Sequence, residues 1–498
     1  MNKPNILFIL TDQWRGDFLG SLDHVVKTPF LDELAGEGFT FTNAYAASPS
    51  CIPARACILT GQTPATTNRI GYMDGVPWEY EDNMIECLNE GGYQTINVGK
   101  THFYPRRNNC GFEINKLYDP QNWIDNQLSD YHQWLKEETN DKIQDSANIY
   151  NNNGFAYIPW TYDNYLHPTE WTASEAINQL KSRDRTRPFF MQMGFHRPHP
   201  PLDPPTEYYN MYKDITFDKA KIGDWESDDA KKTTSHNSPM IGVKKETDRQ
   251  DALKAYCGLI THIDHQIGKM MYYLSKYEPN TVIIFTSDHG DLLGDHGGWR
   301  KIYPYEGSAK IPMIIKTPDT SQITINKAHE YRRDDTVITH MDIMPSILEL
   351  ANINIPKKVE GKSFIPVLYG EKIKNREYIH GEHSAYNFMS VQFITDGKYK
   401  YCYDALSGIE LFFDLVSDPN ELHNGIGDIK YKEKVILFRQ RLILQLKDRE
   451  EGFVKEGKLQ KNIILAPIRK KLLETGDNSK WHRHVKTQIS ELKKQGIL

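Results

Sequence analysis

The amino-acid sequence predicts an α/β fold: a large, mostly parallel sheet flanked by helices, then a smaller C-terminal antiparallel sheet with a helix. Three observations support this prediction. Short apolar runs alternate with amphipathic stretches up to about residue 370, which is typical of strands joined by helices. Beyond that point the runs alternate apolar with polar residues and are separated by Gly and Asp turns. The length of 498 residues is also too great for one simple core.

Five apolar runs in the first part are predicted to be buried strands: NILFILT, TINVGK, FFMQMGF, TVIIFTSD and MIIKTP. Helices are predicted between them, for example over residues 248–277 and 342–352. Four polar residues fall just after these runs, and they are Asp12, Lys100, His199 and Asp288. Because the chemistry of α/β sheets gathers at the carboxyl ends of the strands, this convergence predicts a functional site there.

The last part of the chain predicts the smaller sheet through the runs EYIHGEH, MSVQFITDGKYKYCYD and IELFFDL, with a helix around residues 432–449. We therefore expect two domains. A larger domain over residues 1–372 would carry the functional residues. A smaller α+β domain over residues 373–498 would end in a polar extension.

Composition and charge exclude several classes of protein. The net charge of −6 argues against nucleic-acid binding, which favours a strongly basic surface. No apolar run is long enough to cross a bilayer, so no membrane partner is expected. The N-terminal run ILFIL is short and lacks a small-residue cleavage site, so it predicts a strand rather than a signal peptide. The six cysteines show no paired spacing, as in reduced thiols, and a cytoplasmic protein is expected; no pattern indicates an oligomeric state.

Acidic residues at two strand ends predict a metal site. FILTDQ brings Asp12, and TSDHG brings Asp288 and His289. Two ionised carboxylates brought together are costly without a cation, although a single strand-end Asp more often caps a turn. Gln13 could add an amide oxygen and His289 a nitrogen. This oxygen-rich set favours one hard divalent cation, Ca²⁺ first and Mg²⁺ or Mn²⁺ as alternatives, over zinc.

Basic residues and histidines gather in three further segments. VGKTHF, GFHRPHPP and GDHGGWRK contribute Lys100, His102, His196, His199, Arg300 and Lys301. Each one alone is more simply a solvated lysine or a core histidine. Together they suit an oxyanion site, because lysines act as point charges for tetrahedral anions and histidines exchange protons near neutral pH.

The segment SPSCIPARACILTG places Cys51 at the start of a predicted helix, where a thiolate is stabilised. A plain cysteine hydrolase would need only a neighbouring histidine as base. That explanation leaves the metal-ligand set, Pro53 and Arg55 unaccounted for.

The segment CIPARACILTG resembles the sulfatase signature, C-x-P-x-R followed by a short helix and T-G. Further segments are similar to blocks of that family in the family order, between about residues 5 and 424: NILFILTDQ, KTPFLDELAGEGFTFTNAYA, VGKTHF, FHRPHPP, FTSDHGDLLGDHG and ELFFDLVSDPNELHN. The resemblance implies an alkaline phosphatase-like fold and hydrolysis of carbohydrate or aryl sulfate monoesters. It also implies that a formylglycine-generating enzyme oxidises Cys51 to formylglycine (3-oxoalanine).

Carried over by position, the resemblance implies a role for each motif residue. The formylglycine hydrate at residue 51 would be nucleophile and metal ligand, completing the site of Asp12, Gln13, Asp288 and His289. Arg55 would hold the hydrate. Lys100 and Lys301 would bind the sulfate oxygens. His102 would take up the remaining hydroxyl proton, and His199 would protonate the leaving alcohol; His196 matches the family position less well. Further substrate contacts are expected among Arg106, Arg107, Trp299, Arg300 and His383.

Two departures keep an alternative open. Many sulfatases have Asp where this chain has Gln13 and Asn where it has His289. Both differences are similar to the related phosphonate monoester and phosphodiester hydrolases, which usually lack the Lys-x-His pair seen here as Lys100 and His102. A two-metal phosphotransferase would need a second ligand set where these residues and Lys301 stand. A non-catalytic relative would leave Cys51 unmodified. The sequence therefore favours a sulfatase acting on a small sugar or aryl sulfate.

Overall fold

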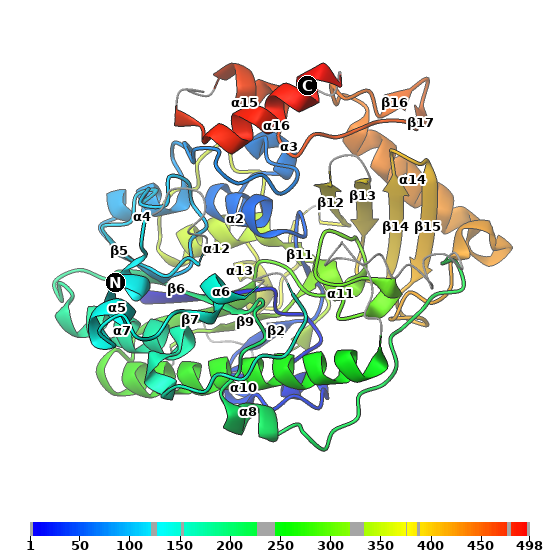
Figure 1. Cartoon of the computed structure of the whole chain (residues 1–498). Coiled ribbons are helices and arrows are strands. Elements are labelled where there is room, and N and C mark those ends of the chain that lie inside the picture. The colour runs from blue at the N-terminus through cyan, green and yellow to red at the C-terminus, as the bar shows by residue number, and fades with distance from the viewer. Residues whose placement is uncertain are drawn as a thin grey trace.

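The computed structural model describes residues 3–120, 127–150, 154–226, 245–318, 333–374, 376–385, 389–475 and 480–495. Its central eight-stranded sheet has the order β10-β2-β9-β7-β1-β6-β4-β5 (Figure 1). In that order the strands are Arg333–Asp334, Phe39–Phe41, Met313–Lys316, Thr281–Ser287, Asn5–Asp12, Phe189–Pro198, Gln94–Gly99 and Ile114–Leu117. The five runs predicted as buried strands are β1, β4, β6, β7 and β9, so that prediction is confirmed.

The middle of this sheet is parallel. β7, β1, β6, β4 and β5 pair in parallel, whereas β9 is antiparallel to β7 and to β2. β1 is buried along its whole length, because a parallel strand covered on both faces needs an almost continuous apolar run. Its side chains alternate: Leu7 and Ile9 join one core cluster, and Ile6, Phe8 and Leu10 join the other.

Helices cover both faces of the large sheet (Figure 1). α1 (Pro29–Glu37), α7 (Pro168–Ser182) and α10 (Glu246–Tyr277) contribute to the core with Leu7 and Ile9. α2 (Cys51–Thr60), α4 (Met84–Glu90) and α12 (Ile343–Leu350) contribute to the opposite core. The expected helices over 248–277 and 342–352 correspond to α10 and α12.

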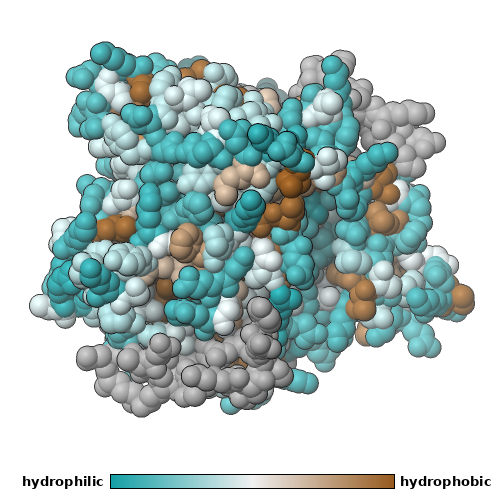
Figure 2. Space-filling model, turned by 90° about the horizontal axis from the view of Figure 1, so that it is seen from below, coloured by the Kyte–Doolittle hydropathy of each residue, from teal (hydrophilic) through white to brown (hydrophobic). Residues whose placement is uncertain are grey.

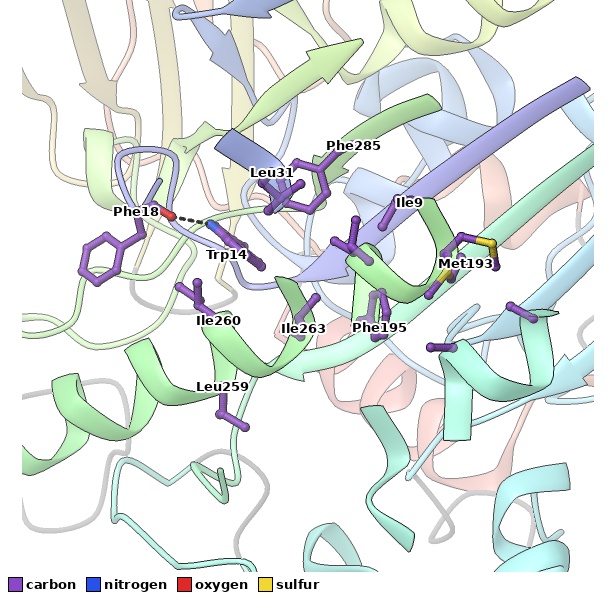
Figure 3. Close-up of a cluster of buried hydrophobic side chains, with 14 of the residues drawn as sticks. Ile9, Trp14, Phe18, Leu31, Met193, Phe195, Leu259, Ile260, Ile263 and Phe285 are labelled. Carbon is purple, nitrogen blue, oxygen red and sulfur yellow. Dashed lines mark hydrogen bonds between the residues drawn. The ribbon is translucent and has the colours of Figure 1, made fainter. Parts of the chain in front are cut away.

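Trp14 anchors the turn that follows β1 (Figure 3). Its indole is fully buried against Phe285, with ring centroids 5.1 Å apart, and its Nε1 donates to the carbonyl of Phe18 at 2.9 Å. Ile260 and Ile263 of α10 lie in the same cluster. This turn carries the residues that follow the carboxyl end of β1, so the packing of Trp14 in the core fixes the position of those residues.

The smaller sheet is antiparallel and follows in the order β12-β13-β14-β15 (Figure 1). Its strands are Ile379–Ser384, Ser390–Thr395, Tyr399–Asp404 and Ile409–Asp414. α14 (Lys432–Leu446) packs on it through Phe438 and Leu442, which share a cluster with Tyr401 and Phe412. The predicted C-terminal architecture is confirmed, whereas the division between residues 372 and 373 stays a prediction.

The C-terminal extension is packed rather than only solvated. α15 (Lys470–Thr475) and α16 (Arg483–Lys494) follow the apolar segment NIILAPI. Trp481, Val485 and Leu492 form a cluster with Met73 and Val76 from the segment after α2. The extension thus packs on the loop around residues 73–76, which also carries Asp74, a contact of His102.

Short elements complete the described fold. They are β3 (Ala44–Tyr45), β8 (Lys310–Ile311), β11 (Ile338–Thr339), β16 (Val454–Lys455), β17 (Lys458–Leu459), α3 (Pro64–Thr67), α5 (Asp130–Glu138), α6 (Ser146–Ile149), α8 (Thr206–Asn210), α11 (Glu306–Ala309) and α13 (Ile365–Leu368). Within the described ranges, no helix is both long and apolar enough to traverse a bilayer. Seen from below in Figure 2, hydrophobic side chains form small separate patches on a largely hydrophilic face.

Candidate active site

Adjacent parallel strands deliver the predicted polar residues to one edge of the large sheet. β1 ends at Asp12, β7 is followed by Asp288, β6 by His199, and β4 by Lys100. The pairing of Thr11 with Ser287 brings the ends of β1 and β7 level with each other. The side chains are buried, as expected for groups that lie at the carboxyl ends of neighbouring parallel strands.

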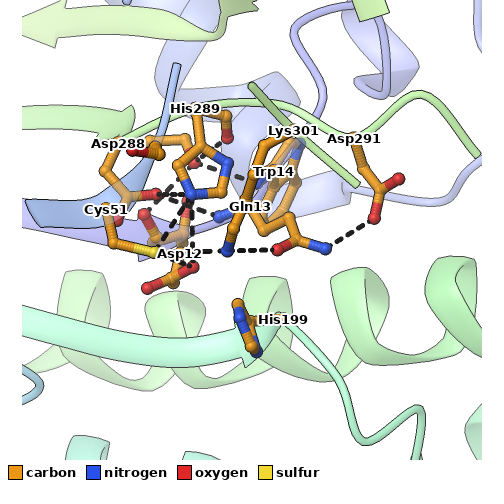
Figure 4. Close-up of polar contacts among 12 residues, drawn as sticks. Asp12, Gln13, Trp14, Cys51, His199, Asp288, His289, Asp291 and Lys301 are labelled. Carbon is orange, nitrogen blue, oxygen red and sulfur yellow. Dashed lines mark hydrogen bonds and ion pairs between the residues drawn. The ribbon is translucent and has the colours of Figure 1, made fainter. Parts of the chain in front are cut away.

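Four of the candidate ligands form a compact cluster (Figure 4). Asp12, Cys51, Asp288 and His289 each offer a donor atom within 4.8 Å of the others, and all four are buried. His289 Nε2 lies 3.7 Å from Asp12 Oδ1, 3.5 Å from Asp288 Oδ1 and 3.2 Å from Cys51 Sγ. Two buried carboxylates with one imidazole nitrogen fit a hard divalent cation.

Gln13 lies beside this cluster with its amide engaged by two neighbours. Its Oε1 accepts from Lys301 Nζ at 2.8 Å, and its Nε2 donates to Asp291 Oδ2 at 2.6 Å. Its backbone N–H donates to Asp288 Oδ1 at 3.1 Å. The residue has a φ of 70°, in the left-handed region that costs energy for a residue other than glycine. Backbone strain is therefore stored at the centre of the site.

Three cations surround the two carboxylates. Arg55 lies one helical turn after Cys51 on α2, and its Nε donates to Asp288 Oδ2 at 2.9 Å. Its Nη2 lies 3.4 Å from Asp12 Oδ2, and Lys100 Nζ lies 2.7 Å from the same oxygen. Burial alone would raise the pKa of Asp12, but the cations Lys100, Lys301 and Arg55 together hold it well below its usual value. Asp12 is therefore ionised.

Cys51 is the first residue of α2 and is 1% exposed. Lys301 Nζ lies 3.2 Å from its sulfur. Burial and Asp12 oppose ionisation of the thiol, but Lys301 and His289 outweigh them and lower its pKa to about 5. In the other five cysteines burial raises the pKa instead. The position of Cys51 thus stabilises an anion, which the ordinary buried cysteines do not.

Two histidines flank the cluster in different electrostatic states. Burial, Lys301 and Lys100 hold the pKa of His199 well below its usual value despite Asp12, so the ring is neutral. His199 Nδ1 lies 2.9 Å from the carbonyl oxygen of Pro200. His102 Nε2 lies 3.5 Å from Asp74 Oδ2; although burial and Lys100 oppose protonation, contacts with Asp74 and Cys51 raise its pKa to about 9.

His196 packs on His199, with ring centroids 4.7 Å apart, but its hydrogen bond belongs to a neighbouring polar network. Its ring packs 5.7 Å from Tyr118, centroid to centroid, and its Nδ1 contacts the guanidinium of Arg197. Arg197 in turn forms a two-pronged ion pair with Asp203, with a shortest distance of 2.6 Å. His196 therefore supports the segment that carries His199.

The residues expected to be further contacts separate into two groups. Arg106 donates to the backbone carbonyls of Asp119 and Gln127, and the half-exposed Arg107 pairs with Asp130 at 2.6 Å. Trp299 stacks on Phe155 with centroids 5.2 Å apart. In contrast, Arg300 and His383 lie next to residues of the cluster.

His383 reaches the start of α2 from the smaller sheet. Its Nε2 lies 3.0 Å from Ser50 Oγ, one residue before Cys51. The neighbouring Glu382 donates its backbone N–H to the carbonyl of Ala47 at 3.0 Å, and Ile302 donates to that of Pro49 at 2.8 Å. The contacts of Ser50 and Asp291 carried no signal in the sequence, because their partners come from distant segments.

Comparisons with known proteins agree with this geometry. A sequence model described as Sulfatase matches residues 4–353, and one described as N-sulphoglucosamine sulphohydrolase, C-terminal, matches residues 294–448. An arylsulfatase of Clostridium perfringens (strain 13 / Type A) is 40% identical over 483 residues, covering 94% of this chain and 99% of the relative.

Two solved structures share the fold. The phosphonate monoester hydrolase of Agrobacterium radiobacter superposes with a TM-score of 0.73 at 24% identity, covering 89% of this chain and 95% of that one. A protein in complex with its substrate D-glucosamine-2-N,6-O-disulfate superposes with a TM-score of 0.70 at 21% identity, covering 90% and 99%. At these identities the likeness concerns the fold alone.

Proposed function

Because the chain belongs to the sulfatase family and is a sulfuric ester hydrolase, we propose that it hydrolyses small sugar or aryl sulfates at residue 51, after Cys51 has become formylglycine. One observation carries the assignment of the centre. The first residue of α2 meets two buried carboxylates and an imidazole within 4.8 Å, in a setting that stabilises negative charge on its side chain. In this proposal formylglycine supplies a hydrated aldehyde at that position.

We propose that Asp12, Gln13, Asp288 and His289 hold one divalent cation together with residue 51, and that it is Ca²⁺. When bound, such a cation neutralises charge on the sulfate and on the attacking oxygen. The donor set supports a hard ion because its carboxylates are fully buried and one imidazole nitrogen faces them. Arg55 would keep both carboxylates in place through its contacts with Asp288 and Asp12.

Lys100 and Lys301 would bind the oxygens of the scissile sulfate. Their ammonium groups contact different residues of the site. Lys100 Nζ contacts Asp12, and Lys301 Nζ contacts Gln13 and Cys51. Fixed cations of this kind stabilise a tetrahedral anion without reorganising when it reacts. Arg300 would be a further substrate contact.

His199 would give a proton to the leaving alcohol. Cations lower its pKa in the absence of substrate, and an entering sulfate would offset them and let the ring take up the proton it later donates. We propose that His102 takes up the remaining hydroxyl proton at residue 51; this role needs a neutral ring, and conversion of Cys51 to formylglycine would remove one of the two contacts, with Asp74 and Cys51, that raise its pKa.

Sulfated sugars are the favoured substrate class. The family model that matches residues 294–448 is described as N-sulphoglucosamine sulphohydrolase, C-terminal, and a structural neighbour was solved in complex with D-glucosamine-2-N,6-O-disulfate. Maturation would require a formylglycine-generating enzyme. A cytoplasmic location stays a prediction, supported by six cysteines that form no disulfide.

A turnover panel on formylglycine-containing protein tests the proposal. The protein would be produced with a formylglycine-generating enzyme, and conversion of Cys51 would be checked by intact mass. Rates on 4-nitrophenyl sulfate and on sugar sulfates would be compared with those on a phosphonate monoester and a phosphodiester, with Cys51→Ala as the inactive control. We expect the highest kcat/KM on a sulfate ester. A higher value on the phosphonate or the phosphodiester than on every sulfate ester would overturn the assignment.

A further inference from the structure

Arg300 is a buried cation whose side chain makes no hydrogen bond or ion pair in the described part of the chain. The residue is 7% exposed, and its Nε is fully buried without a hydrogen bond. Other buried arginines have partners of two kinds. Arg55, Arg197 and Arg249 form ion pairs with carboxylates, and Arg69 and Arg106 donate to backbone carbonyls. The side chain of Arg300 makes neither kind of contact among the described residues. A buried charge without a hydrogen-bonded partner is costly, so an anion from outside the chain would stabilise this guanidinium.

The backbone of Arg300 is fixed to the framework of the active site. Its N–H donates to Asp291 Oδ1 at 2.7 Å, and Asp291 also holds the side chain of Gln13 at 2.6 Å. The carbonyl of Arg300 accepts from the N–H of Leu292 at 2.7 Å. Arg300 and Ile302 both adopt left-handed backbone conformations, with φ values of 68° and 83°. Strain of this kind persists where the surroundings hold a functional segment in place.

The charge of Arg300 acts on residue 51. The next residue, Lys301, reaches Cys51 directly, and Arg300 itself interacts electrostatically with Asp291 and Cys51. Burial lowers its pKa to about 10 against the opposing effect of these two groups, so the side chain is still charged at neutral pH. It is a further cation beside the site, in addition to Arg55, Lys100 and Lys301.

The scissile sulfate already has its partners in the proposed function. Lys100, Lys301 and the bound cation would serve its oxygens, whereas the planar fork of an arginine suits another sulfate or a carboxylate. We propose that Arg300 binds a second anionic group of the substrate, so that the preferred substrates are sulfated sugars carrying a further sulfate or a carboxylate. This inference rests on the proposed function of the same site.

Inhibition of aryl sulfate turnover by matched ligands tests the inference. Formylglycine-containing protein with Ca²⁺ would hydrolyse 4-nitrophenyl sulfate in the presence of one sugar sulfate at a time, and the inhibition would be compared within two pairs of sugar sulfates. N-acetylglucosamine 6-sulfate is compared with glucosamine-2-N,6-O-disulfate, and glucose 2-sulfate with glucuronate 2-sulfate. The first pair differs by a second sulfate and the second pair by a carboxylate, so the two arms distinguish the sources of the anion.

The variants are Arg300→Gln, Arg300→Lys and, as a matched control, Arg187→Gln. Arg187 pairs with Glu113 at 2.6 Å beside the amino end of β6, the opposite end of the strand from the site. We expect the better dianionic ligand to bind Arg300→Gln about tenfold to hundredfold more weakly, with Arg300→Lys between it and the parent. The monoanionic partner and the Arg187→Gln control should change less than about threefold.

Three results would overturn the inference. Equal weakening of both members of a pair would assign Arg300 to the scissile sulfate. Unchanged inhibition of Arg300→Gln would show that Arg300 does not contact the ligand. If neither dianionic ligand inhibits the parent protein better than its monoanionic counterpart, the protein has no subsite for a second anionic group. Failure of the parent to hydrolyse any sulfate ester would instead refute the proposed function, which keeps the two failures separate.

Discussion

The contact between Ser50 and His383 leads to a prediction about catalysis that involves both sheets. Ser50 precedes α2, yet its hydroxyl does not cap that helix; it lies 3.0 Å from His383 Nε2. Burial, His289 and Lys301 lower the pKa of His383 to about 3, so the ring is neutral. Replacing His383 therefore changes no charge near the centre. We expect the pair to act by orienting residue 51.

The perturbation is a double-mutant cycle with Ser50→Ala and His383→Leu, and His383→Gln as the conservative variant. A hydrogen bond between neutral groups contributes about 1 kcal/mol, which corresponds to a roughly fivefold change in rate. If the bond orients residue 51 in the transition state, each single variant loses about fivefold in kcat with little change in KM. The double variant should be no slower than the worse single one, because both remove the same bond.

The assay is turnover of 4-nitrophenyl sulfate, normalised to the formylglycine content measured by intact mass. Thermal unfolding of each variant separates orientation from a loss of folding stability. His383→Gln should recover most of the rate, since its amide can bond to Ser50. Additive losses in the double variant, or lower melting temperatures with kcat unchanged, would refute the reasoning.

Three further predictions follow from the charges. Removing divalent cations with EGTA should abolish sulfate turnover and lower the melting temperature, because the carboxylates of Asp12 and Asp288 are buried. Activity and melting temperature should both recover more fully with Ca²⁺ than with Mg²⁺. A melting temperature insensitive to EGTA would contradict the metal site. Lys301→Met should lower kcat/KM for aryl sulfates by about 10²–10³, with Lys301→Arg retaining more activity, and equal activity of the parent and Lys301→Met would exclude the role. Burial raises the pKa of Asp264 to about 7 despite N–H donation from Leu31 and Phe30. The protonated form of Asp264 contributes stability that is fully present below the unfolded pKa of about 4 and is lost as the pH rises through 7, by up to about 4 kcal/mol. The melting temperatures of the parent and of Asp264→Asn should therefore diverge between these pH values. Parallel curves of melting temperature against pH would refute the shift.

The sequence could predict the strand-end residues because their placement is local. Asp12 and Asp288 each come at the end of an apolar run, and functional polar residues of a parallel sheet gather at the carboxyl ends of its strands. Arg55 was expected from the resemblance to the C-x-P-x-R signature, and four positions after Cys51 on a helix it lies on the same face. These positions depend on periodicity and not on distant partners.

The remaining contacts depend on which distant segments meet. Ser50 and His383 are separated by 333 positions, and nothing in either segment indicates the other. Arg106 resembles a substrate contact in sequence, but it is satisfied by backbone carbonyls of residues 119 and 127. Gln13 was expected near the metal, whereas its hydrogen bonds to Lys301 and Asp291 follow from a loop conformation that the residue pattern does not encode.

The charges of the centre explain why residue 51 would have to change chemically for this site to work on anions. Asp12, Asp288 and an ionised Cys51 face Arg55, Lys100 and Lys301, and His102 and Arg300 add positive charge beside them. Replacing the thiolate with an uncharged aldehyde and adding a divalent cation would leave the same residues with an excess of positive charge. Buried from water and salt, that excess would attract a sulfate ester strongly. The unmodified thiolate would instead occupy the position of the anion that the site is built to receive.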